Sequence, residues 1–323
     1  LPIIEFIKDY LQSHGVASNL VYNDDNTKAN LYANVGPNEV GGVVLSGHTD
    51  VVPIDGQSWD TDPFKIKEAD GKIYGRGTCD MKGFLAICLS LVPNMIKSKL
   101  NKPIQLAFSY DEEVGCVGAP FMIREMKKTL PKASCVIVGE PTLLKLVDGH
   151  KASIGLDTEV TGFEVHSSLL PSGVSAIMTA SRLINWITDK TEENQKRPPR
   201  DLDKLFNPPF TTLHVGKISG GTASNITAKK CSFTTDIRCL PLDDGEKIIN
   251  DYEKYAEKLA AQIKEIRPEA NISIKRHHWV PGLKPENDGL ADNLVRKITS
   301  ENSTGKVSYG TEAGQFQEEG YST

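Results

Sequence analysis

The chain contains 323 residues, of which 39% are hydrophobic and 24% charged, and its formal net charge is −5. This length is enough for two domains, and the composition is that of an ordinary globular protein. The mild charge and the lack of a lysine- or arginine-rich block argue against nucleic acid as a partner. No apolar run reaches the ~20 residues needed to cross a bilayer, so we expect no membrane partner. The six cysteines have no Cys-x-x-Cys spacing, which favours free thiols in a cytoplasmic protein.

The first 150 residues predict a domain of the α/β class, with a mostly parallel sheet flanked by helices. Helical spacing of apolar residues covers residues 3–14 and 84–96. Short apolar runs bounded by turn residues predict strands within residues 19–32 and at 43–45, 104–109 and 135–138. Valine- and leucine-rich runs beside glycine are typical of strands buried in a parallel sheet, which has helices on both faces.

From about residue 151 the pattern changes to that of a small α+β module. Strands are predicted at residues 152–160, 211–218, 229–238 and 271–279, and helices at 172–189 and 246–266. The order strand-helix-strand-strand-helix-strand is that of a ferredoxin-like sandwich. Helix and loop segments resume afterwards. We therefore expect residues 151–280 to be inserted into a catalytic domain formed by residues 1–150 and 281–323.

His48 and Asp50 directly follow the strand predicted at residues 43–45. Ligands of open α/β sheets collect beyond the carboxyl ends of such strands, and side chains two residues apart in extended chain point the same way. A metal-bound imidazole commonly has its second nitrogen held by a carboxylate or carbonyl. A structural histidine paired with a loop aspartate fits this short pattern equally well, so both interpretations stay open at this point.

Further acidic residues follow the other predicted strands. Glu112 and Glu113 come after one strand, Glu140 comes after another, and Asp80 begins a predicted helix, where it could also serve as an N-cap. Adjacent carboxylates repel one another unless a cation lies between them. The convergence of these groups with His48 at one edge of the sheet predicts a divalent metal site. Oxygen and imidazole donors without thiolate suit zinc, manganese or cobalt.

The ordered motifs of this chain resemble those of the M20 metallopeptidase family, a family of co-catalytic zinc amidohydrolases. The matching segments run in family order at residues 47–53, 75–83, 111–113, 139–142, 166–168, 221–225 and 236–238. One such motif alone would be weak, but the ordered set is specific. The resemblance implies hydrolysis of an amide bond in a small N-acyl amino acid. It also implies that the inserted module acts as a dimerisation or lid domain, and hence a homodimer.

The resemblance assigns four metal ligands, namely His48, Asp80, Glu113 and Glu140. It implies two zinc ions, with cobalt or manganese as alternatives, and makes Asp80 the ligand shared by both. Two ions ~3.5–4 Å apart can polarise a carbonyl and activate water together. The family also has a cis peptide after the shared aspartate, which predicts one at Asp80–Met81.

The same resemblance assigns the catalytic groups. Asp50 is expected to hold His48 in place, and Glu112 is expected to act as the general base that takes a proton from the attacking water. His166 is expected to stabilise the oxyanion, from its own subunit or from a partner. The alternative for His166 is an ordinary histidine in a surface loop.

Three residues are candidates for substrate contacts. Asn225 and Arg238 belong to the inserted module, where Arg238 could hold an α-carboxylate or form a structural ion pair instead. Glu312 offers a negative charge to a cationic side chain, which favours N-acetylornithine, converted to ornithine and acetate in arginine biosynthesis. N-succinyl-diaminopimelate and N-acetylcitrulline are the alternative substrates.

One departure from the family pattern concerns its last metal ligand, a histidine in a downstream segment. No histidine follows His278 in this chain, which runs to Thr323. The resemblance therefore predicts that the segment 281–323 is incomplete, and that a chain ending here binds one of two metals poorly. Two other function classes remain open: a metal-dependent exopeptidase, which would differ only in its pocket, and a binding protein without activity, against which the presence of Glu112 argues.

Overall fold

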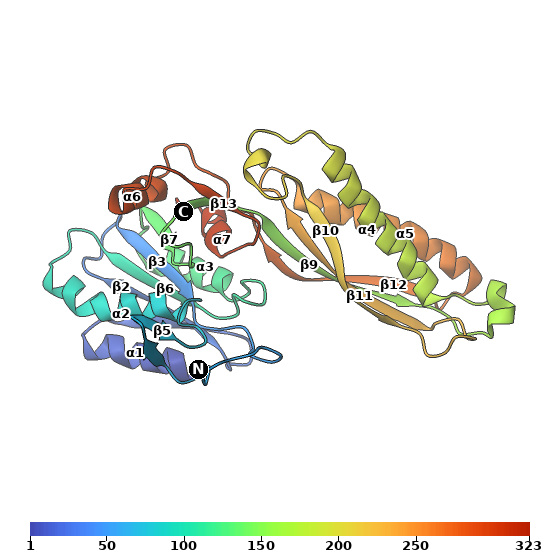
Figure 1. The fold of residues 1–323 in the computed structure, drawn as a ribbon, viewed down its shortest axis with the longest axis horizontal. Helices are drawn as coiled ribbons and strands as arrows, with labels where there is room; N and C mark the ends of the chain where they lie inside the picture. Colours follow the sequence, from blue (N-terminus) through green and yellow to red (C-terminus); the bar gives the residue numbers. More distant parts are fainter. The chain divides into compact units, whose positions relative to one another are not determined.

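The computed structural model describes residues 1–323 and divides them into two compact units (Figure 1). The first unit comprises Leu1–Asp148, Leu283–Gly305 and Thr311–Thr323, and the second comprises Gly149–Gly282 and Lys306–Gly310. The chain leaves the first unit within β8 (Val147–His150) and returns to it at Leu283. It enters the second unit again within β13 (Gly305–Val307), for residues Lys306–Gly310 only. No helix is both long and apolar enough to span a membrane.

The first unit is built on a five-stranded sheet. Its strands lie in the order β1 (Ser18–Tyr22), β2 (Ala29–Val35), β6 (Ile104–Ser109), β3 (Val43–His48) and β7 (Cys135–Val138). β3 pairs in parallel with both β6 and β7, whereas β2 is antiparallel to both of its neighbours. Four of the five strands therefore point the same way, and the predicted mostly parallel sheet is confirmed.

Helices cover both faces of this sheet. The helices α1 (Pro2–Ser13) and α2 (Lys82–Lys97) share a core cluster with Leu106 and Phe108 of β6. The helices α3 (Ala119–Thr129) and α7 (Ala313–Glu318) contribute to a second cluster with Ala107 of the same strand. Alternate residues of β6 thus point to opposite faces, as the pleat of a strand requires. A further helix, α6 (Leu290–Thr299), contacts β7.

The second unit has the predicted ferredoxin-like order. Its elements are β9 (Ala152–Thr161), α4 (Ala176–Lys196), β10 (Thr212–Gly220), β11 (Lys230–Cys239), α5 (Gly245–Ile266) and β12 (Asn271–Val280). The strands form an antiparallel sheet in the order β10-β11-β9-β12, and the apolar faces of α4 and α5 pack on one side of it. Two short 3-10 helices, Ser167–Ser172 and Asp203–Leu205, lie in its loops.

A buried polar network fixes the long loop between α4 and β10. Asp243 accepts hydrogen bonds from Arg200 and from Thr211, whose hydroxyl lies 2.5 Å from Asp243 Oδ2. Lys151 is fully buried and donates to the carbonyl of Pro208 at 2.7 Å. These contacts supply the partners that buried charged groups need.

We expect His278 on β12 to make the stability of the folded protein depend on pH. Burial, together with the neighbouring His277, lowers the pKa of His278 from 6.5 to about 4, and its Nε2 lies 3.0 Å from Ser153 Oγ. Below pH 6.5 the unfolded chain binds a proton that the folded chain does not, so stability falls as the pH decreases from 6.5 to 4. We expect His278→Gln to reduce this fall without abolishing it, because His150 is also buried and its pKa is also lowered to about 4. Calorimetric Tm values of the unaltered protein and of His278→Gln across this pH range test the prediction. The same pH dependence of Tm in the two proteins would contradict it.

Candidate active site

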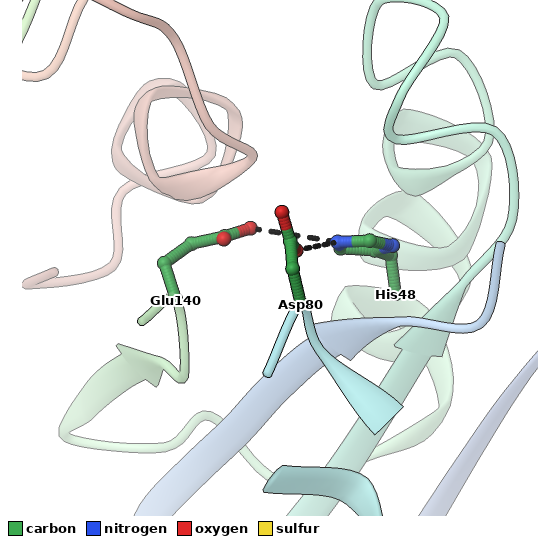
Figure 2. Close-up of side chains that lie close together, drawn as sticks. All are labelled: His48, Asp80 and Glu140. Carbon is green, nitrogen blue, oxygen red and sulfur yellow. Dashed lines mark hydrogen bonds and ion pairs between the residues drawn. The ribbon is translucent and has the colours of Figure 1, made fainter. Parts of the chain in front are cut away.

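His48 lies at the carboxyl end of β3 with its side chain 1% exposed. Its Nε2 atom is 3.0 Å from Asp80 Oδ1 and 3.8 Å from Glu140 Oε1. Figure 2 shows the three side chains with these interactions as dashed lines. One ligand atom from each of the three residues lies within 4.8 Å of the others. The structure therefore brings together three of the four expected metal ligands, from three separate segments of the chain.

Asp80 reaches this cluster from the loop that precedes α2. The N-cap of that helix is Met81, which makes no side-chain capping bond, so Asp80 does not serve as the N-cap. The Asp80–Met81 peptide bond is cis, as predicted. Gly47, just before His48, makes room for this turn: a Cβ atom there would lie 2.5 Å from the Met81 side chain. A larger residue at position 47 would require the side chains of Met81 and Leu85 to shift.

Asp50 connects the imidazole to the loop that follows β6. Its Oδ1 lies 3.4 Å from His48 Nδ1, and its backbone oxygen lies 3.2 Å from the same nitrogen. Its two carboxylate oxygens accept hydrogen bonds from the backbone amides of Glu112 and Glu113, each at 3.1 Å. A proton on Nδ1 can be donated to Asp50, which leaves the lone pair of Nε2 directed at Asp80 and Glu140.

Glu112 and Glu113 occupy different surroundings. The Glu112 carboxylate accepts a hydrogen bond from the buried Cys116 thiol at 3.3 Å, and burial raises the pKa of Glu112 to about 7. The Glu113 carboxyl is less enclosed, and burial together with the charge of Asp80 raises its pKa. Glu113 does not belong to the three-residue cluster, so its role as a ligand stays a prediction.

The charges around His48 fit a divalent cation. Burial alone would lower the pKa of His48, but the hydrogen bond with Asp50 and the surrounding carboxylates raise it to about 10. Burial and the Glu112 carboxylate raise the pKa of Glu140 to about 8. Without a cation such a cluster holds protons at neutral pH, and a metal ion would displace them. The donor set of one imidazole and several carboxylates suits zinc, cobalt or manganese.

The three predicted residues of the inserted module all lie in the second unit. His166 and Asn225 are neighbours there: His166 forms a bridge with Ile226, and the amide of Ser167 donates to the carbonyl of Asn225 at 2.8 Å. Both side chains are exposed. Arg238 donates through Nε to Asp236 at 3.0 Å, which is the ion pair foreseen as its alternative role. Their contacts with substrate stay predictions.

Glu312 has a different environment from the one expected for a substrate contact. It directly precedes α7 and is 1% exposed. Its two oxygens accept hydrogen bonds from the hydroxyls of Ser46 and Ser109, at 2.6 and 2.8 Å. In this structure the carboxylate is therefore not available to a substrate side chain. Neither serine was predicted as a site residue from the sequence, although Ser46 precedes His48 by two residues and so shares its face of the sheet.

A buried histidine that faces carboxylates at the carboxyl edge of a mostly parallel sheet is the kind of site that holds a divalent metal in enzymes of the α/β class. Residues 44–322 match the family described as peptidase family M20/M25/M40. The chain belongs to this family and is a metal-dependent amidohydrolase.

Curated relatives and solved structures agree with this assignment. The chain is 33% identical over 318 residues to the acetylornithine deacetylase of Pasteurella multocida (strain Pm70). The matched residues make up 98% of this chain and 80% of that protein. It is 35% identical over 293 residues to the acetylornithine deacetylase of Salmonella typhimurium, covering 90% of this chain and 73% of that protein. An M20 family metallo-carboxypeptidase from Sulfolobus solfataricus superposes with a TM-score of 0.77 at 18% identity. The superposition covers 98% of this chain and 83% of the carboxypeptidase chain. A Staphylococcus aureus tripeptidase superposes with a TM-score of 0.70 at 20% identity, and the superposition covers 99% of this chain and 82% of the tripeptidase chain.

Proposed function

We propose that this protein is a cytoplasmic zinc-dependent deacylase that hydrolyses N-acetylornithine to ornithine and acetate, a step of arginine biosynthesis. The observation that carries the proposal is the cluster of His48, Asp80 and Glu140 with Glu112 beside it. The chain's similarity to acetylornithine deacetylases over 90% or more of its length supports the choice of substrate.

In this proposal, different residues bind the metal ions, transfer the proton and position the other groups. Divalent ions held by His48, Asp80, Glu140 and, by our proposal, Glu113 would polarise the scissile carbonyl and increase the acidity of water. Glu112 accepts a proton from the attacking water as the C–O bond forms and a tetrahedral oxyanion develops. It then delivers that proton to the amine nitrogen, and the C–N bond breaks. Asp50 fixes the imidazole on one side and the Glu112 backbone on the other.

The second unit supplies the remaining contacts in this proposal. His166 donates a hydrogen bond to the developing oxyanion, and its exposed position beside Asn225 is compatible with such a contact. Asn225 and Arg238 bind the carboxylate end of the substrate. We further propose that the protein is a homodimer, which light scattering coupled to size exclusion tests directly.

Activity assays on the full-length protein test the substrate. We expect turnover of N-acetylornithine with a kcat/KM at least 10-fold above that for N-succinyl-diaminopimelate, N-acetylcitrulline or a dipeptide. The dipeptide is included because several of the solved structures of similar fold are peptidases. Faster hydrolysis of any of these three compounds would overturn the proposed substrate, and a protein that cleaves only dipeptides would be an exopeptidase.

A further inference from the structure

Glu312 places a buried carboxylate close enough to the candidate active site to interact electrostatically with His48 and Asp50. Its Oε1 accepts from Ser46 Oγ at 2.6 Å and its Oε2 accepts from Ser109 Oγ at 2.8 Å. Both serine residues are fully buried, and Glu312 itself is 1% exposed. All three groups belong to the first unit, so this arrangement does not depend on the second.

The two serines belong to the strands that carry the reacting groups. Ser46 lies on β3 two residues before His48, and Ser109 is the last residue of β6, where it is the register partner of His48. β6 leads directly into the loop that contains Glu112. One carboxylate therefore joins the end of the strand that presents the imidazole to the end of the strand that presents the general base.

Burying the Glu312 carboxylate costs folding free energy, which would be unnecessary if the side chain only filled space. A buried carboxylate loses its hydration, and hydrogen bonds from two hydroxyls compensate for only part of that loss. Burial accordingly raises the pKa of Glu312. An apolar side chain would fill the same position at lower cost to folding. What the carboxylate adds is geometry, because two hydrogen bonds from adjacent strands fix their spacing where the site begins.

We propose that Glu312 is a positioning residue: through Ser46 and Ser109 it holds the ends of β3 and β6, and thereby fixes where His48 and Glu112 lie. It does not recognise the substrate side chain. This inference rests on the proposed function for its kinetic consequences, but its consequence for metal affinity does not require a particular substrate. Both consequences are measurable.

The test uses Glu312→Gln and the double variant Ser46→Ala/Ser109→Ala in the full-length protein. We expect each to lower kcat about 10- to 100-fold, equally for N-acetylornithine and for N-acetylalanine, whose side chain is uncharged, with KM unchanged within about 2-fold. Combining all three substitutions should cause no further loss, because they interrupt one contact. We also expect each variant to bind zinc at least about 10-fold more weakly, measured by competition with a chelator.

Thr211→Val is the matched control, because it removes a buried hydroxyl from a carboxylate in the second unit. It should lower Tm but leave kcat and zinc affinity unchanged. A loss confined to N-acetylornithine would overturn the inference in favour of substrate recognition. A lower Tm with unchanged kcat and zinc affinity would overturn it in favour of a structural role. If the unaltered protein hydrolyses neither compound, the proposed function fails, and zinc affinity alone then decides the inference: weaker binding supports it and equal binding refutes it.

Discussion

Replacement of Glu112 with glutamine is expected to lower kcat about 10³-fold, within the range that general acid–base catalysis contributes. Glutamine has the same size, and its amide oxygen can still accept the hydrogen bond from Cys116. It cannot take a proton from water or return one to the leaving amine. Because we propose Glu112 as the general base and not as a metal ligand, the metal content of the variant should equal that of the unaltered protein.

Steady-state kinetics and elemental analysis of the same preparation check this prediction. Glu113→Gln is the informative comparison, because it alters the adjacent carboxylate, which we propose as a ligand. That variant should lose metal and activity together, whereas Glu112→Gln should lose activity alone. A Glu112→Gln protein that keeps a tenth of its kcat would end the role of Glu112 as general base.

The strands that support the site were predictable because burial on both faces leaves a simple pattern. β6 and β7 were predicted with the boundaries that the structure has, since each is an almost continuous apolar run. The hairpin β4 (Lys67–Ala69) and β5 (Lys72–Tyr74) was not predicted, because its residues are mostly exposed and bury no apolar face. α3 was also not predicted, although its buried residues recur at helical spacing.

The site was predictable to the extent that its residues lie at strand ends. His48 is the last residue of β3, and Asp50 and Glu140 come shortly after β3 and β7, so the edge of the sheet brings them together. The environment of Glu312 was not predictable, because it depends on a contact with Ser46, 266 residues earlier in the chain. A charged residue in a loop indicates exposure when the sequence is considered alone. Only the folded structure shows that two hydroxyls surround it.

Removal of divalent metal should abolish activity and lower the Tm of the first unit, and zinc should restore both. Without a cation, the carboxylates around His48 face one another, and burial and mutual repulsion raise the pKa of Glu140 to about 8. A ligand that binds only the folded state at 1,000 times its Kd stabilises that state by about 4 kcal/mol. For a unit of this size, that corresponds to a rise in Tm of roughly 10 °C.

Asp80→Asn separates the metal effect from nonspecific effects of zinc. The substitution keeps the size of the side chain but removes the charge that lies 3.0 Å from His48 Nε2. We expect the variant to show no rise in Tm with zinc, whereas Glu159→Gln, which alters an ion pair with Lys230 in the second unit, should respond like the unaltered protein. Differential scanning calorimetry with chelator and with added zinc measures both. A Tm that is insensitive to metal, or an Asp80→Asn protein that binds zinc normally, would mean that the carboxylates around His48 do not hold a metal ion.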